Sequence, residues 1–265
     1  MKSLKCVTKI EKYQAIIEGQ PVNVNDVRQL YDCSIFVQGA KLAKTTQFVC
    51  DLSDEKDYEC QTLILDAYDL PVRTTRTSQE LLADFEQQTK TSQKAIKESI
   101  CAVMKVKKNK FPFINHDCLL MKLSGSARRN TSMVGLTYLD NLTRCSCGAE
   151  SALLTFHNGL EIIIPITYRT IKVNVANAVE YDCIFHQHES LLDQDSLSLT
   201  FMKDWTGSYC RLLTDVHKAA CKHYNLKVYY LYRYRASSYE MFKEMKLVES
   251  VLEYEEFLVD ESFSS

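Results

Sequence analysis

The stretch "LLTFHNGLEIIIPI", residues 153–166, constrains the fold more than any other part of the chain. Two apolar runs flank the pair Asn158-Gly159, which favours a two-residue type I′ turn because both central residues need a positive φ. Pairing across this turn gives two mostly apolar faces, so we expect an antiparallel hairpin that is covered on both sides. One expected face holds Leu153, Thr155, Ile162 and Ile164, and the other holds Leu154, Phe156 and Ile163.

The rest of the chain predicts an α+β fold with a strand-rich core and a more helical C-terminal part. Short apolar or alternating runs before residue 70 are typical of strands: "YQAIIEG", "SIFVQG", "TQFVCDL" and "QTLILDAYDL". "TSQE" at 77–80 is a capping box, which predicts that a helix begins there. After residue 186 we expect a strand in "LKVYYLYRYR", a helix from Ser237 and an acidic tail.

Positive charge is concentrated in one segment of a chain whose formal net charge is -2. Between Lys94 and Arg144 there are ten cations and three anions, a local charge of +7. Such a concentration attracts polyanions, and nucleic acid is the most common partner of a basic patch. A solvated surface remains an alternative. So does a protein-interaction regulator whose basic segment binds an acidic partner, including the chain's own acidic tail.

Three pieces of the middle of the chain resemble the ComK competence transcription factor family. They are "KFPFINHDCLLMKLSGSARRN", "MVGLTYLDNL" and "LTFHNGLEIIIPITYRTIKVNVANA", in that order. Met133 and Gly135 stand where the family usually has Cys and Trp. The resemblance covers about 70 of the 265 residues, from about Lys110 to Ala178.

This resemblance implies a cytoplasmic transcription activator of competence and DNA-uptake genes that contacts A·T-rich duplex DNA through the minor groove. It also implies RNA polymerase, a proteolytic adaptor and a second copy of the chain as partners. We accordingly expect three regions: strand-rich residues 1–75, a DNA-binding core at 76–185, and an α/β region at 186–265. The three can still form one compact domain.

The expected DNA contacts divide by their chemistry. Lysines position a protein on phosphates without reading sequence. Arginines after small residues suit a narrow A-tract groove, where the negative potential is strongest, and an asparagine can bind base edges there. The expected DNA-binding residues are Lys105, Lys107, Lys108, Lys110, Lys122, Arg128, Arg129, Asn130 and Arg144.

Other kinds of site have weaker support in the sequence. Cys145 and Cys147, with Cys183, His186 and His188, could bind zinc, but their spacing is irregular and buried free thiols beside surface histidines are the simpler interpretation. No Gly-x-Ser-x-Gly, P-loop or His-Glu-x-x-His motif appears, so we expect neither an enzyme nor a cofactor. No apolar run is long enough to span a membrane, so we expect no membrane association.

Overall fold

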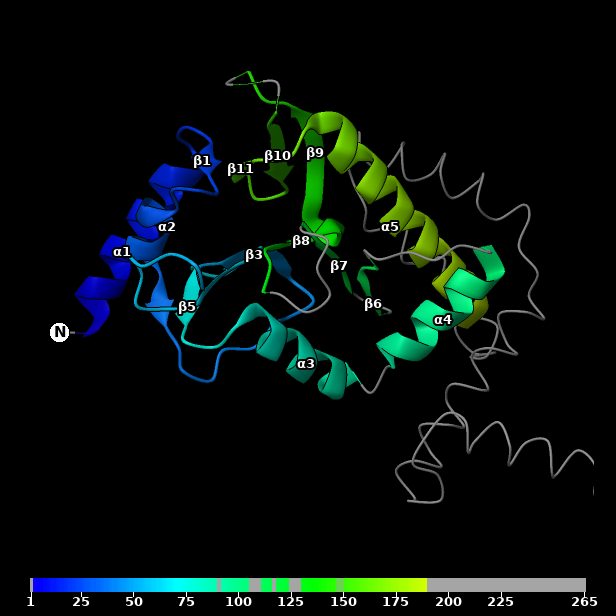
Figure 1. Ribbon diagram of the computed structural model, residues 1–265. Helices are drawn as coiled ribbons and strands as arrows, with labels where there is room; N and C mark the ends of the chain where they lie inside the picture. Colours follow the sequence, from blue (N-terminus) through cyan, green and yellow to red (C-terminus); the bar gives the residue numbers. More distant parts are fainter. Residues whose placement is uncertain are drawn as a thin grey trace, which may run out of the picture. The chain divides into compact units, whose positions relative to one another are not determined.

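The computed structural model describes residues 2–89, 92–104, 111–115, 118–123, 130–146, 148 and 150–189, with side chains from residue 8 to residue 186 (Figure 1). The fold is α+β, as predicted. The strand, helix and acidic tail predicted after residue 189 lie outside the described residues.

The chain divides into two compact units that are not consecutive in sequence. The first joins Met1–Thr91 to Asn109–Lys222, and the second joins Ser92–Lys108 to His223–Ser265. The regions 1–75, 76–185 and 186–265 that were predicted from the sequence do not have the same limits as these two units. The division into three regions stays a prediction. Both β-sheets belong to the first unit.

A mixed seven-stranded sheet forms the larger part of the first unit, in the order β2-β5-β4-β3-β8-β7-β6. Only β2 and β5 run parallel, and the other neighbours pair antiparallel. The predicted strands at "TQFVCDL" and "QTLILDAYDL" are confirmed as β3 and β4, and "SIFVQG" contributes only the two-residue edge strand β2. The strands are β2 (Ile35–Phe36), β3 (Thr46–Asp51), β4 (Thr62–Asp66), β5 (Val72–Thr74), β6 (Phe113–Asn115), β7 (Cys118–Lys122) and β8 (Met133–Gly135).

A smaller sheet of four strands, in the order β1-β11-β10-β9, contains the hairpin. One turn of 3-10 helix, η1 (Leu136–Tyr138), carries the chain directly from β8 in the larger sheet into β9. At the other edge, β1 pairs parallel with β11. The strands are β1 (Val22–Asn23), β9 (Leu139–Arg144), β10 (Ala152–Phe156) and β11 (Glu161–Ile164).

The hairpin is present, but its turn and register differ from the prediction. The Gly159 N–H donates to the Phe156 carbonyl at 2.8 Å, and the Phe156 N–H donates to the Leu160 carbonyl at 2.9 Å. His157 and Asn158 are therefore the central turn residues, and Gly159 follows them with φ +88°. A three-residue loop of this kind combines a turn with a glycine bulge, which shifts the pairing by one residue relative to a two-residue loop.

The shift regroups the side chains on the two faces. Leu154 now lies opposite Ile162, and Leu153 lies opposite Ile163. Both members of the first pair are buried, whereas both members of the second are half-buried. We expected the hairpin to be covered on both sides; one face is the core face, and the other is only partly covered.

The first helix is the clearest departure from the sequence prediction. "YQAIIEG" belongs to the end of α1 (Lys2–Ile17) and is not a strand. Its apolar residues Tyr13, Ile16 and Ile17 follow a helical i, i+3, i+4 spacing. Tyr13 is buried, and the Cγ2 atom of Ile17 lies 3.3 Å from the position that a Cβ on Gly159 would take. The C-terminal turn of α1 thus packs against the hairpin turn.

Two further helices in the first unit are short, and the predicted capping box is confirmed at the start of one of them. α2 (Arg28–Cys33) leads into β2, and α3 (Ser78–Thr89) follows β5. The Glu80 N–H donates to the Thr77 hydroxyl at 3.1 Å, while the Thr77 N–H donates to the Glu80 carboxylate at 2.8 Å. These reciprocal bonds satisfy two N–H groups that have no partner within the helix, and they hold the pKa of Glu80 below its usual value.

Two helices build the core of the first unit against the sheets. α3 buries Leu81 and Phe85 in a cluster with residues of β3, β4, β6, β7 and β8, and the rings of Phe85 and Phe113 are 5.1 Å apart. α5 (Tyr168–Glu189) packs on β7, β9 and β10, so one helix spans both sheets. Phe111 stacks on Tyr181 of α5 at 5.1 Å.

The second unit contributes one described helix, α4 (Gln93–Met104), which buries Ala95, Ile96, Ser99, Ile100 and Val103. None of the helices among the described residues combines the length and the apolar character needed to cross a membrane.

Candidate nucleic-acid interface

The basic segment predicted from the sequence is divided between the two units. Of the described cations, Lys94 and Lys97 belong to the second unit, and Lys122 and Arg144 belong to the first. Lys94 and Lys97 lie on α4, where Lys94 is exposed and Lys97 is half-buried. The ten cations are therefore not all positioned by one compact unit.

Three of the nine predicted DNA-binding residues lie within the described structure: Lys122, Asn130 and Arg144. The other six, Lys105, Lys107, Lys108, Lys110, Arg128 and Arg129, lie outside the described residues.

Lys122 and Asn130 lie at the same end of the β7–β8 ladder. Lys122 is the last residue of β7 and pairs with Met133, the first residue of β8. One step further out, the Leu123 N–H donates to the Ser132 carbonyl at 3.0 Å. The described structure thus brings these two residues together on either side of the segment that carries Arg128 and Arg129.

Hydrogen bonds from two other elements hold the outgoing side of this hairpin. The Thr131 N–H donates to the Ser78 hydroxyl of α3 at 3.0 Å. The Asp51 N–H of β3 donates to the Ser132 hydroxyl at 3.0 Å. The backbone that enters β8 after Asn130 is therefore fixed against both the first turn of α3 and the end of β3.

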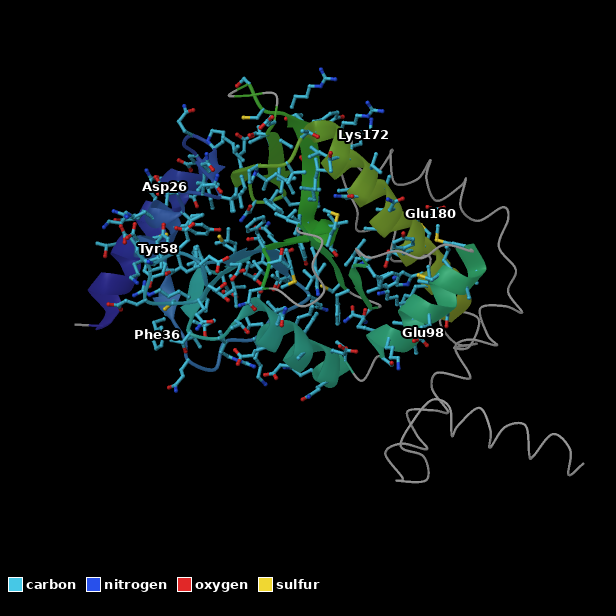
Figure 2. All side chains as sticks on the ribbon, viewed as in Figure 1. Asp26, Phe36, Tyr58, Glu98, Lys172 and Glu180 are labelled. Atoms are coloured by element: carbon cyan, nitrogen blue, oxygen red, sulfur yellow. The ribbon has the colours of Figure 1, made fainter. Side chains whose placement is uncertain are left out.

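Arg144 lies elsewhere, at the far end of the path that runs from β8 through η1 and β9 (Figure 1). Its guanidinium carbon is 5.8 Å from the centre of the Tyr168 ring, and the Lys172 ammonium is also 5.8 Å from that centre. Arg144 and Lys172 are both exposed, and so is Arg169 beside Tyr168. We call Arg144, Tyr168, Arg169 and Lys172 the α5 cluster. Figure 2 labels Lys172 near the start of α5.

The start of α5 adds to the positive character of the α5 cluster. Thr167 caps the helix, because its hydroxyl accepts the Thr170 N–H at 3.2 Å. The N-terminus of a helix carries a partial positive charge from its aligned peptide dipoles. Arg169 and Lys172 were not predicted as site residues, although "TYRTIK" directly follows the hairpin. Arg144 lies close to the start of α5 because β9 pairs with β10, and this pairing was not predicted from the sequence.

A different face of the first unit is acidic. A groove of about 570 Å³ is lined by Asp26, Asp32, Glu55 and Asp57, and Arg28 is the one cation among the described residues of that lining. Arg28 pairs with Asp57 at 3.5 Å, with both side chains largely exposed. Like charge repels a phosphate backbone, so this groove is unsuited to nucleic acid.

The cysteines give limited support to the alternative zinc site. Six described cysteines have free thiols, and four of these are buried: Cys33, Cys50, Cys60 and Cys118. Cys145 takes part in a disulfide bond, which differs from the expectation of free thiols. Burial raises the pKa of the Cys50 thiol to about 12.

Of the five residues considered for zinc, Cys147 and the side chain of His188 lie outside the described structure. His186 faces the buried Asp182 at 3.4 Å. Within the described residues, no three His, Cys, Asp or Glu side chains are grouped so that they could hold a metal ion.

Comparison with known proteins identifies no relative: no family model, curated protein or solved structure matches the chain.

Proposed function

We propose that this chain is a DNA-binding transcription regulator that contacts A·T-rich duplex DNA through the minor groove and activates genes of DNA uptake. The observation that carries the DNA-binding part is the α5 cluster, where exposed Arg144 and Lys172 each lie 5.8 Å from the centre of the Tyr168 ring. The resemblance to the ComK family supports the choice of target genes and of the minor groove.

The α5 cluster is the proposed phosphate contact. Arg144 lies on β9, an edge strand of the four-stranded sheet, and Lys172 lies in the first turns of the long helix α5. Both side chains are therefore attached to regular secondary structure. Contacts of this kind position a protein on the duplex and supply affinity without reading sequence.

The segment after β7 is the proposed reader of sequence. Arg128 and Arg129 follow the small residues of "SGSA", and Asn130 is the described residue at which the chain returns toward β8. An arginine sheds water more readily than a lysine and presents a planar fork, which favours entry into a narrow A-tract groove.

Filter binding over a salt series tests the phosphate contact. Replacing Arg144 and Lys172 by Ala should weaken binding to A·T-rich and G·C-rich duplexes alike, and the slope of log K against log salt should fall by about 1.8, at about 0.9 per lost contact. Lys41→Ala with Lys44→Ala is the matched control, since both lysines are exposed and lie before β3. Equal slopes for the two double variants would contradict the proposed contact.

Competition between the two duplexes at fixed salt tests the sequence reader. Arg128→Lys with Arg129→Lys keeps the charge and should narrow the preference for A·T-rich DNA, with a smaller effect on general affinity. An unchanged preference would place these arginines outside the groove. Failure of the unaltered protein to bind either duplex would rule out the proposal and favour an acidic protein partner for the basic segment.

A further inference from the structure

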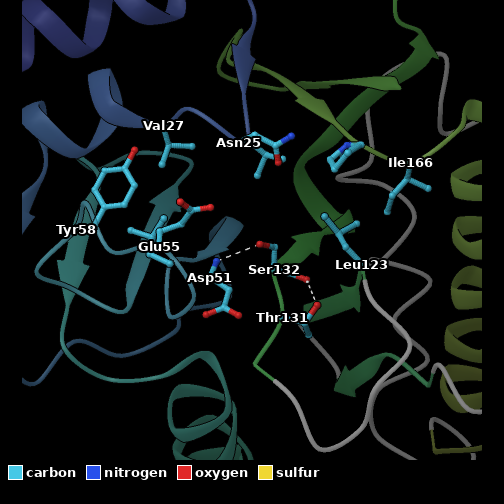
Figure 3. Close-up of a pocket in the computed structure, with 12 residues that line it drawn as sticks. Asn25, Val27, Asp51, Glu55, Tyr58, Leu123, Thr131, Ser132 and Ile166 are labelled. Atoms are coloured by element: carbon cyan, nitrogen blue, oxygen red, sulfur yellow. Dashed lines mark hydrogen bonds between the residues drawn. The ribbon is translucent and has the colours of Figure 1, made fainter. Parts of the chain in front are cut away.

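A separate pocket of about 320 Å³ opens between the two sheets of the first unit (Figure 3). Its walls come from the end of β1, the end of β11, the β3–β4 connection and the β7–β8 hairpin. The volume lies within the range of small-molecule sites. The lining residues are Val24, Asn25, Val27, Asp51, Leu52, Glu55, Tyr58, Leu123, Thr131, Ser132, Pro165 and Ile166.

The pocket changes from apolar and buried at its base to polar and exposed at its mouth. Val27, Leu52 and Leu123 are buried, whereas Asn25 and Glu55 are exposed. In Figure 3 the Glu55 carboxylate points toward the open space in the middle of the view, and the Asp51 carboxylate points away from it. The Glu55 carboxylate therefore lies at the mouth and is directed toward the pocket.

The charges around the pocket decide which ligands it can accept. Among the residues that the structure describes, its lining holds two carboxylates and no Lys, Arg or His side chain. The acidic groove adjoins it and shares Asn25, Glu55 and Tyr58 with it, so the field at the mouth is negative. This field repels phosphates and carboxylates and concentrates cations.

Two cationic alternatives fit the lining less well. A bound metal ion needs several hard ligands together, and none of the described residues form such a group. A fully hydrophilic polycation would leave the apolar base of the pocket in contact with water. A ligand with an apolar body and one charged end matches both parts.

We propose that this pocket binds a small primary amine, with its ammonium group beside Glu55 and its alkyl or aryl body against Val27, Leu52 and Leu123. The Asn25 side chain at the mouth supplies a second polar partner. This inference goes beyond the proposed function and does not rest on it, because none of the lining residues is one of the proposed DNA contacts.

Calorimetric titration of the full-length protein with three matched probes tests the charge requirement. The probes are 2-phenylethylamine, 2-phenylethanol and 3-phenylpropionate, which share an aryl body and differ in charge. We expect the amine to bind several-fold more tightly than the alcohol, and the acid to show no binding. No binding of the amine at millimolar concentration, or equal binding of all three probes, would overturn the proposal.

Two sets of variants locate the site. Glu55→Gln should weaken the amine about threefold to tenfold, the range for a charge-assisted contact at a partly solvated site, and should leave the alcohol unaffected. Asp54→Asn is the matched control, because it removes an exposed neighbouring carboxylate that does not line the pocket. Equal effects of the two changes would mean that only the general field attracts the amine, which contradicts a contact with Glu55.

Filling the pocket should abolish binding of both the amine and the alcohol. Val24→Phe and Ile166→Phe each place an aryl ring at a half-buried wall position, from different strand ends. Circular dichroism melts identify which of the two variants keeps its fold, and the titration is repeated on that variant. Retained amine binding in a folded, filled variant would place the amine elsewhere and refute the inference.

Discussion

Among the five glycines that the structure describes, Gly135 in β8 is the one where an added methyl group should damage the protein most. β8 lies between β3 and β7 in the middle of the seven-stranded sheet. A Cβ built on Gly135 would overlap the Thr46 carbonyl oxygen, and it would also lie 3.1 Å from the Thr46 carbonyl carbon and 3.3 Å from the Gln47 Cα. All three atoms are backbone, so no side-chain rotation relieves the overlap.

The cost of Gly135→Ala follows from what has to move. Ordinary carbon–oxygen contacts are about 3.3 Å, so β3 and β8 would have to separate by more than about 1 Å. Overpacking of a core costs about 1–3 kcal/mol, and each weakened ladder hydrogen bond costs about 0.5–1.5 kcal/mol more. Because β3 and β8 pair over Phe48–Val134 and Val49–Met133, two ladder hydrogen bonds are weakened, and we expect a total loss of about 2–6 kcal/mol.

Urea unfolding followed by circular dichroism measures this loss. With a slope near 3 kcal/mol/M, the midpoint of Gly135→Ala should fall by roughly 0.7–2 M. Gly39→Ala is the matched control, since a Cβ there meets no atom within 4 Å and the expected change in unfolding free energy is within about 0.5 kcal/mol. Equal midpoints for the two variants would refute the argument from close strand approach.

Three further outcomes test other features of the fold. Gly159→Val should destabilise the protein, because φ is +88° and the new side chain would meet α1, and an unchanged melting temperature would contradict the turn geometry. Burial raises the pKa of Tyr13 to about 12, so the stability that its neutral phenol contributes should be present below about pH 10 and be lost as pH rises toward 12. When the midpoint of urea unfolding is plotted against pH, Tyr13→Phe should remove this decline between about pH 10 and 12. The buried Cys50 thiol should react with iodoacetamide at pH 8 more slowly than the half-buried Cys101 thiol. Mass spectrometry after a short pulse of reagent measures the two rates, and faster labelling of Cys50 would contradict its burial.

Features that depend on a few neighbouring residues were predictable from the sequence. The Thr77–Glu80 capping box is local in this sense, since each residue satisfies a backbone group of the other. The existence of the hairpin was also predictable, because Asn158-Gly159 lies between two apolar runs. Its register was not, since choosing between a two-residue and a three-residue loop moves every pair by one position.

Features that depend on distant partners were missed. Tyr13, Ile16 and Ile17 have helical spacing, but the run is short and apolar, so periodicity alone did not separate helix from strand. Gly135 and Thr46 approach closely although they are about 90 residues apart in sequence, so no local sequence pattern predicts the contact. The α5 cluster has the same origin, because the fold and not the sequence order brings Lys172 to Arg144.

The parallel pairing of β1 with β11 has a consequence for the order of synthesis. Val22 leaves the ribosome early, but its partner is Ile162, 140 residues later in the chain. At about 5–20 residues per second, β1 waits roughly 7–28 s for that partner. During this interval the apolar side of α1 also lacks the hairpin turn on which it packs. Chaperone capture of nascent chains is therefore expected to be strongest before residue 164 has emerged, and to fall once β11 can close the four-stranded sheet.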